Sequence, residues 1–346
     1  MASTISEIAQ LAGVSTATVS RAFSNKGYIS ETQRQRILEI AQEHNYLPKD
    51  YKRHSVDSRL ENDIAIVAPD IYNSYFHDII RGIQSVTDKM GCDIFICDTN
   101  GSVKKEIRYL DSLKKKRIGG IIISVASDNE KYNIEFLENL NRTDIPVVLI
   151  DRDVHSRILD GVFFDDYHGA YQATQAIIEA GHSEIAIICG ATETRTGVDI
   201  LNGYLAALKE ASIPIKEEYI LYGEYSENRA YELTKKLLTT QPNVTSCFCS
   251  NGVMAEGFLH AVKECKLRIP NDIAFISYGK REFYNYMEPP ISYVDRPVYE
   301  AGIECAKILA DKMRLKKRQR MQPKKNLLFG TTLCLNGSER YPTSKK

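Results

Sequence analysis

The chain begins with a stretch in which apolar residues recur at the spacing of one helix face. Across residues 4–12 they fall on one side, and Thr4 forms a capping box with the glutamate three residues later. The pattern breaks at Gly13 and resumes over residues 16–23, with Ser15 placed to cap the second segment. Two short helices joined by a brief turn are therefore predicted, which is the arrangement of a helix-turn-helix.

A third helix is predicted after a short loop. Ser30 and Gln33 form a second capping box, and the apolar residues of the next turns lie on one face. The pattern ends at Leu47 and Pro48, because proline does not continue a helix. Residues 1–48 are expected to form a small all-α domain.

From residue 63 the pattern changes to short, almost continuously apolar runs, most of them separated by segments long enough for helices. The runs cover residues 64–69, 92–97, 119–125, 146–151, 161–165, 184–190, 246–250, 273–278 and 291–294. This alternation predicts α/β units with parallel sheets covered on both faces. The units are too many for one compact sheet. They fit two Rossmann-like subdomains with a cleft between them, where the carboxyl ends of the strands gather ligand contacts.

Composition narrows the class of protein. The 346 residues carry 45 Lys+Arg and 45 Asp+Glu, and 43% are hydrophobic, which excludes collagenous, disordered and supercharged chains. No apolar run is long enough to span a membrane and the N-terminus shows no secretory signal, so a cytoplasmic protein without a membrane partner is expected. The 8 cysteines are scattered without a CxxC pair, which predicts buried thiols in a reducing compartment and neither a metal nor a cofactor.

The predicted second helix has the composition of a helix that reads DNA. Its solvent face carries Thr16, Ala17, Thr18, Ser20 and Arg21. Small residues let a helix approach base edges, hydroxyls reach phosphate oxygens, and an arginine pairs with guanine through two hydrogen bonds. Helix periodicity alone also fits a three-helix domain with an ordinary polar face.

The segment TISEIAQLAGVSTATVSRAFSNKGYISETQRQRILEIAQEHNYLP closely resembles the headpiece of the LacI/GalR (lac-repressor) family of transcriptional regulators. The AGVSxATVSR core, the GYxS loop and the xYxP ending stand in order. The resemblance implies binding to double-stranded operator DNA. The implied base contacts are Thr16, Ala17 and Arg21, the residues near phosphates are Thr4, Thr18 and Ser20, and Ser15 completes the DNA-binding set.

Residues 49–62 form the expected hinge, and here the sequence departs from the family. The family usually carries an Ala-Arg-x-Leu segment that becomes helical on DNA, with its leucine wedged into the minor groove. Lys52 and Arg53 keep the charge that phosphate contacts need. Ser55 stands at the leucine position, and the adjacent Val56 is the candidate for a smaller wedge. The alternative is a charged linker that never becomes helical.

The body resembles the effector domain of the same family, which is similar to periplasmic sugar-binding proteins. Matching segments, from PDIYNSYFHDIIRGI to PPISYVDRPVYEAG, follow in the expected order. The resemblance implies three crossings between the subdomains, near residues 162, 293 and 326. The effector domain is then 63–340, with an N-subdomain of about 63–162 and 294–325 and a C-subdomain of about 163–293 and 326–340. The chain stops soon after its last strand without an added heptad helix, so a homodimer is expected rather than a tetramer.

Positions matched to the family provide the candidate effector-binding residues. They are Tyr75, Phe76, Asp151, Arg152, Asp165, Asn251 and Arg296. Aromatic faces stack on sugar rings or bases, and fixed carboxylates and amides suit hydroxyl groups. Any one of these residues could instead form a structural ion pair or be a charge on a solvated loop. The prediction of a pocket therefore rests on the occurrence of all seven together.

Departures from the family leave the ligand class open. Ile200 stands where an arginine is common, and Gly252 and Gly279 stand where aspartates contact sugar hydroxyls. The neighbouring Lys280 and Arg281 favour an acidic or phosphorylated ligand, unless they are exposed loop charges.

These features predict a sequence-specific DNA-binding transcriptional regulator, most simply a repressor of carbohydrate-use genes that senses a sugar, sugar acid or sugar phosphate. The alternative is a solute-binding protein of a sugar transporter, against which the headpiece argues. An enzyme is not expected, because the chain has no GxGxxG after the first strand and no P-loop, HExxH or GxSxG motif. The basic run at 312–325 fits a second nucleic-acid patch or a solvated loop.

Overall fold

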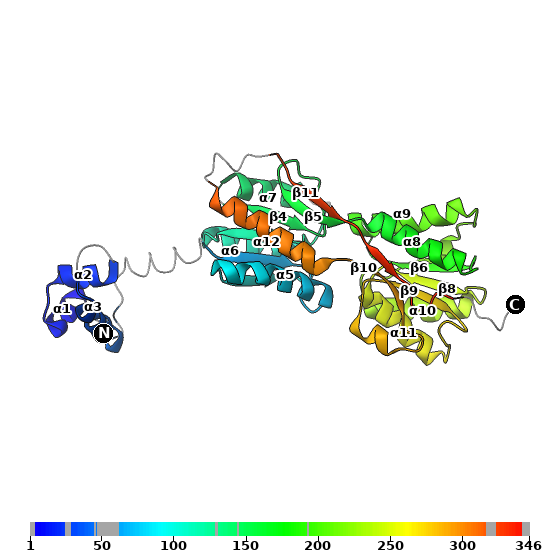
Figure 1. The fold of residues 1–346 in the computed structure, drawn as a ribbon, viewed down its shortest axis with the longest axis horizontal. Helices are drawn as coiled ribbons and strands as arrows, with labels where there is room; N and C mark the ends of the chain where they lie inside the picture. Colours follow the sequence, from blue (N-terminus) through cyan, green and yellow to red (C-terminus); the bar gives the residue numbers. More distant parts are fainter. Residues whose placement is uncertain are drawn as a thin grey trace.

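The computed structural model describes residues 4–24, 29–44, 46, 62–128, 131–143, 145–191, 194–315 and 323–340. Nearly all of the expected hinge lies outside the described residues, and with it Lys52, Arg53 and Val56. The described chain forms a helical headpiece and two α/β subdomains (Figure 1). None of the described helices is long and apolar enough to cross a membrane.

The headpiece contains the three predicted helices, α1 (Ile5–Ala12), α2 (Thr16–Ser24) and α3 (Glu31–Glu43). Thr4 caps α1 through the predicted capping box with Glu7. Gly13 ends α1 with a φ of 67°, a left-handed conformation that glycine adopts without steric cost. Apolar side chains from all three helices meet in one core, which includes Ile8, Val19, Phe23 and Ile37.

The N-subdomain is built on a sheet of strand order β11-β5-β4-β3-β1-β2, in which every neighbouring pair is parallel. Its strands are β1 (Ile64–Ala68), β2 (Ile94–Asp98), β3 (Gly120–Ile123), β4 (Val147–Ile150), β5 (Asp160–Phe164) and β11 (Asn326–Phe329). Its helices are α5 (Ser74–Met90) and α12 (Val298–Arg314) on one face, and α6 (Val103–Lys115) and α7 (Lys131–Thr143) on the other. Strands β1, β3 and β4 are buried along their whole length, which explains their continuous apolar runs.

The C-subdomain repeats this arrangement with strand order β12-β10-β9-β8-β6-β7, where only the β12–β10 pair is antiparallel among the described strands. Its strands are β6 (Ile185–Cys189), β7 (Ile220–Tyr222), β8 (Ser246–Cys249), β9 (Ala274–Tyr278), β10 (Ser292–Asp295) and β12 (Thr332–Cys334). Its helices are α8 (Asp166–Glu179) and α9 (Arg195–Glu210) on one face, and α10 (Glu227–Thr240) and α11 (Gly252–Glu264) on the other. Short 3₁₀ helices cover Glu217–Tyr219 and Glu282–Tyr286.

Three short strands were not among the predicted apolar runs. They are β7, β11 and β12, and all three lie at sheet edges. Their side chains are exposed or only partly buried. An edge strand therefore needs fewer apolar residues, and its pattern is weaker.

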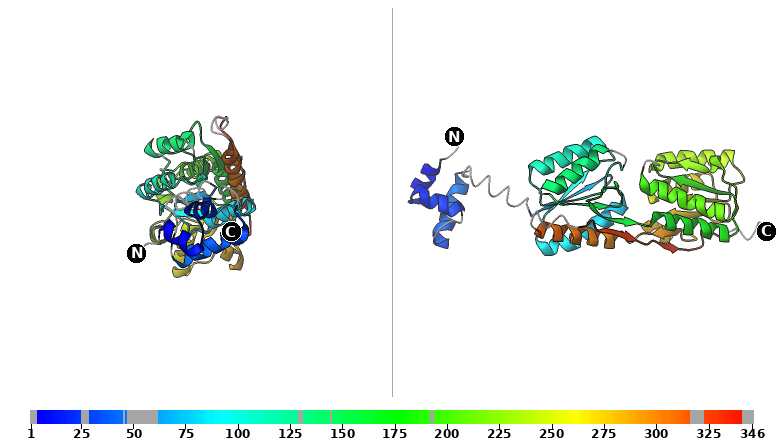
Figure 2. Two further views of the ribbon diagram at one scale, coloured as in Figure 1. Left: turned by 90° about the vertical axis from the view of Figure 1, so that its left-hand side faces the viewer. Right: turned by 90° about the horizontal axis from the view of Figure 1, so that it is seen from above.

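The chain crosses between the subdomains three times, as expected, but a few residues later than predicted (Figure 2). The crossings lie at Asp165, at 296–297 and at 330–331, instead of near 162, 293 and 326. Strand β5, for example, stays in the first sheet up to Phe164, which pairs with Phe329 of β11. An apolar strand has the same pattern in either sheet, so the sequence does not show where the chain leaves one for the other.

Candidate functional site

Helix α2 presents the predicted DNA-binding side chains on the surface of the headpiece. Its buried side is formed by Val19, Ala22 and Phe23. The predicted set Thr4, Ser15, Thr16, Ala17, Ser20 and Arg21 is exposed, and Thr18 is half-buried. Ser15 accepts a hydrogen bond from the backbone N–H of Thr18 over 3.2 Å, which makes it the cap of α2. The helix therefore offers small residues and one arginine to a partner surface.

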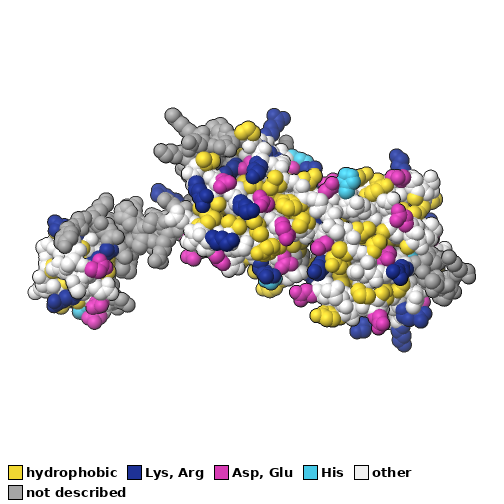
Figure 3. All heavy atoms as spheres, viewed as in Figure 1, with side chains coloured by type: hydrophobic (Ala, Val, Ile, Leu, Met, Phe, Trp, Pro, Cys, Tyr) yellow, Lys and Arg dark blue, Asp and Glu magenta, His cyan; other side chains and the backbone are white. Residues whose placement is uncertain are grey.

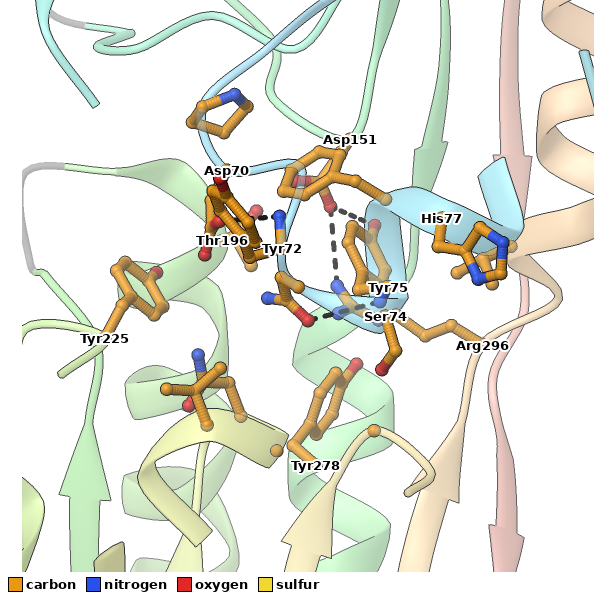
Figure 4. Close-up of a pocket in the computed structure, with 18 of the residues that line it drawn as sticks. Asp70, Tyr72, Ser74, Tyr75, His77, Asp151, Thr196, Tyr225, Tyr278 and Arg296 are labelled. Atoms are coloured by element: carbon orange, nitrogen blue, oxygen red, sulfur yellow. Dashed lines mark hydrogen bonds and ion pairs between the residues drawn. The ribbon is translucent and has the colours of Figure 1, made fainter. Parts of the chain in front are cut away.

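A cavity of about 1010 Å³ lies between the two subdomains. Its lining comes from the segments that follow the carboxyl ends of β1 to β4 in the N-subdomain and of β6 to β10 in the C-subdomain. Figure 4 shows Tyr75 and Asp151 from one subdomain facing Tyr225 and Tyr278 from the other. The volume lies at the upper end of the range for small-molecule sites.

Arg296 lies on the wall of this cavity, in the segment that crosses from β10 to α12. Its Nη1 is 3.4 Å from Asp151 Oδ1 and 3.6 Å from Asp166 Oδ1, so the guanidinium pairs with a carboxylate of each subdomain. The hydroxyl of Tyr75 donates to Asp151 over 2.5 Å, and that of Tyr278 donates to Asp166 over 2.7 Å. Arg296 and these four side chains thus form one connected cluster on the side of the cavity where the chain crosses between the subdomains.

Burial dominates the electrostatics of this cluster. It raises the pKa of Asp166 to about 7, although the neighbouring Arg296 acts in the opposite direction. Burial also raises the pKa of Tyr75 and of Tyr278 well above the ordinary value, so both phenols stay protonated and act as donors. The cluster therefore holds one permanent cation, and one of its two carboxylates takes up a proton near neutral pH.

The structure brings most of the predicted effector residues to the cavity. Those that line it are Tyr75, Phe76, Asp151, Arg152, Asn251 and Arg296. Several already have protein partners: Arg152 donates to the backbone carbonyls of Val125 and Ala126 over 2.9 and 3.1 Å, and Asn251 caps α11. Their side chains shape the cavity wall as well as offering contacts.

Asp165 is the predicted effector residue that the structure places elsewhere. It is the N-cap of α8 and contacts His168, and it does not line the cavity. The carboxylate that joins the Arg296 cluster is the next residue, Asp166. Adjacent residues at a helix start point in different directions, and two neighbouring aspartates give no signal that separates them. Tyr225 and Tyr278 were not predicted as cavity residues. Nothing in the sequence distinguishes a tyrosine at or shortly after a strand end that faces a cleft from one that does not.

The basic residues near the cavity do not form a free cationic surface. Arg281 pairs with Glu256, and Arg296 pairs with Asp151 and Asp166. Lys280 is exposed. Over the body as seen in Figure 3, basic and acidic side chains are interspersed.

A helix-turn-helix headpiece joined to two α/β subdomains around a ligand-sized cavity defines a DNA-binding regulator with a sensing body. Residues 4–49 match the family model of bacterial regulatory proteins of the lacI family. Residues 61–322 match the model of periplasmic binding proteins and the sugar-binding domain of the LacI family. The chain therefore belongs to the LacI family of DNA-binding transcriptional repressors.

Curated relatives and solved structures agree with this assignment. The HTH-type transcriptional regulator DegA of Bacillus subtilis (strain 168) is 31% identical over 304 residues, which cover 88% of this chain and 89% of DegA. The HTH-type transcriptional repressor PurR of Aliivibrio salmonicida (strain LFI1238) is 28% identical over 317 residues, covering 92% and 94%. The lac repressor dimer bound to operator and the anti-inducer ONPF has the same fold, with a TM-score of 0.74 at 21% identity over 98% of this chain and 100% of that one. A regulator rather than an enzyme is confirmed.

Proposed function

We propose that this repressor binds a specific operator and that a small molecule in the cavity sets its affinity for that operator. The observation that carries the proposal is the shared lining of the cavity, with Arg296 joining a carboxylate of each subdomain beside it. A ligand in this position contacts both subdomains at once. It therefore favours whichever relative arrangement it binds better, and the headpieces respond to that arrangement.

The proposed effector is carbohydrate-derived. Tyr72, Tyr75 and Tyr225 offer aromatic side chains around the cavity, and the body matches a family model that includes sugar-binding domains. Because Arg281 and Arg296 already pair with carboxylates, a neutral sugar is favoured over a sugar acid or sugar phosphate. A thermal-shift screen with neutral sugars, sugar acids, sugar phosphates and purines tests this class. Stabilisation by purines alone would reject a carbohydrate effector.

Operator binding is tested by gel shift with the intact protein and a set of near-palindromic duplexes. The proposal requires binding that survives competition by non-specific DNA and changes when the stabilising compound is added. A protein that binds sugars but no duplex would support the alternative, a solute-binding protein of a transporter.

The proposed functional unit is a homodimer acting in the cytoplasm, where the DNA is. One headpiece presents a single recognition helix and covers only one half-site, so two headpieces are needed for a near-palindromic operator. The solved lac repressor on its operator is a dimer, which supports the same arrangement here.

A further inference from the structure

Arg281 connects the two subdomains across the mouth of the cavity. It follows β9 in the C-subdomain, and its Nη1 donates to Ser74 Oγ at the start of α5 in the N-subdomain over 2.7 Å. In its own subdomain, Glu256 of α11 accepts from Arg281 Nε over 2.6 Å. The Arg281 side chain is only 17% exposed, whereas Ser74 lies on the surface.

The path of the Arg281 side chain depends on Gly252, the first residue of α11. A Cβ at position 252 would lie 2.8 Å from Arg281 Cδ and 3.1 Å from Cγ. Any other residue there would push the middle of the arginine side chain away from the start of α11. The glycine at position 252 therefore leaves room for the side-chain conformation in which Arg281 reaches Ser74.

Arg195 makes a second connection of the same kind. It is the first residue of α9, and Asp199 accepts from its Nε over 3.3 Å within the C-subdomain. Across the cleft, Arg195 Nη1 donates to Asp153 Oδ2 over 3.2 Å. Its backbone N–H donates to Asp128 Oδ2 over 2.5 Å, so a carboxylate of the N-subdomain sits at the positive end of a C-subdomain helix.

Neither contact belongs to the crossing segments themselves, and each has one end several strands away from them. The three crossings run beside the edge strand β11 and its neighbour β5 in one sheet, and beside the edge strand β12 and its neighbour β10 in the other. The Arg281 contact joins the ends of β1 and β9, and the Arg195 contact joins the ends of β3 and β4 to that of β6. When two bodies rotate about a hinge, the groups farthest from the hinge separate most. Opening the cleft about the crossings therefore separates the partners in both contacts.

We propose that Arg281 and Arg195 hold the cleft closed in the absence of an effector and so set how far the resting protein is open. Each arginine side chain keeps one partner in its own subdomain and gains a side-chain partner in the other subdomain only when the cleft is closed. An effector that prefers the open arrangement must overcome both contacts, and one that prefers the closed arrangement is helped by them. This role rests on the proposed function, because the effector acts on the same equilibrium.

The test measures closure directly, without effector or DNA. Spin labels introduced as encoded amino acids at Lys104 and Asn228 report the distance between the subdomains by pulsed electron resonance, since both residues are exposed and lie near the cleft-facing starts of α6 and α10. Arg281→Gln and Arg195→Gln are each expected to add a population of longer distances, and the double variant a larger one. Arg268→Gln, which removes an exposed pair with Asp272 inside the C-subdomain, is the matched control and leaves the distribution unchanged.

Ser74→Ala provides a second route that keeps the arginine and Glu256 in place. It removes only the cross-cleft acceptor and is expected to shift the distances in the same direction as Arg281→Gln. A double arginine variant that is folded and has the wild-type distance distribution would overturn the proposal. Failure to find an effector or operator would reject the proposed function, and the distance measurement would still decide whether the arginines close the cleft.

Discussion

The guanidinium of Arg296 lies over the ring of Tyr75, with Cζ 4.1 Å from the ring centroid, and both side chains bond to the same oxygen of Asp151. Cation–π stacking and charge pairing thus act on one arginine in a nearly dry environment. The arrangement joins a residue of a crossing segment to two residues of the N-subdomain, and Asp166 extends it to the C-subdomain.

Replacing Arg296 with glutamine is expected to lower the free energy of unfolding by about 3–5 kcal/mol, because buried carboxylates lose their cation. The side chains of Asp151 and Asp166 are only 8% and 4% exposed. Chemical denaturation measures the loss. The control Arg268→Gln removes an exposed pair and is expected to cost less than about 1 kcal/mol. An equally small loss in both variants would contradict a structural role for the cluster.

Stability is expected to depend on the protonation of Asp166. Burial raises its pKa from 3.8 to about 7, so between these values the folded protein keeps a proton that the unfolded chain releases. This contribution is present below the unfolded pKa and is lost as the pH rises through the folded one. Compared with Asp166→Asn, the wild type should lose at most about 1.4 kcal/mol per pH unit in this window. Urea unfolding of both proteins from about pH 5 to pH 8 measures the difference. If the free energy of unfolding had the same pH dependence in both proteins, Asp166 would not be the group that keeps the proton.

Asp165 at the start of α8 and Asp151 after β4 are expected to differ in function. Asp165→Ala removes the N-cap of α8 and should cost about 1 kcal/mol of stability while leaving the response to effector intact. Asp151→Ala, at the cavity, should abolish that response. Operator affinity of each variant, with and without the compound found by thermal shift, makes the comparison. An unchanged response in Asp151→Ala would place the effector elsewhere.

Arg21 is expected to contribute to the preference of the protein for its operator sequence over other DNA sequences. Arg21→Ala should weaken operator binding by about 1–3 kcal/mol and reduce discrimination against a scrambled duplex. Lys52→Ala and Arg53→Ala should instead weaken binding to both duplexes alike and lower its salt dependence. Fluorescence anisotropy at several salt concentrations distinguishes the two effects. Full operator preference in Arg21→Ala would remove α2 from the role of recognition helix.

The open edge of β2 is expected to take part in the proposed homodimer. Phe95 and Ile96 are consecutive large apolar residues that are 40% and 50% exposed there. Ile96→Glu should raise the dimer dissociation constant at least tenfold in sedimentation equilibrium, an effect of about 1.4 kcal/mol. Leu328→Glu, a 67% exposed leucine at the opposite edge of the same sheet, is the matched control and should not change association. Dissociation by both variants or by neither would argue against the β2 edge.

Local patterns in the chain were sufficient to predict the headpiece helices and the buried strands. The headpiece depends on residues only a few positions apart, namely the helix caps at Thr4 and Gly13 and the apolar faces of α1 to α3. Such short spacings can be recognised in the sequence. The central strands of both sheets are covered on both faces, so nearly all of their residues are buried and apolar. This produces the continuous apolar runs that predicted them.

The assembly of the site depends on contacts between residues far apart in the chain. Arg281 and Ser74 are 207 positions apart, and Arg296 and Asp151 are 145 apart. Whether such pairs meet depends on the angle at which two subdomains close, and no local pattern encodes that angle. The same holds for the choice of Asp166 over Asp165, because the direction of a side chain at a helix start is set by the packing of the helix against its neighbours.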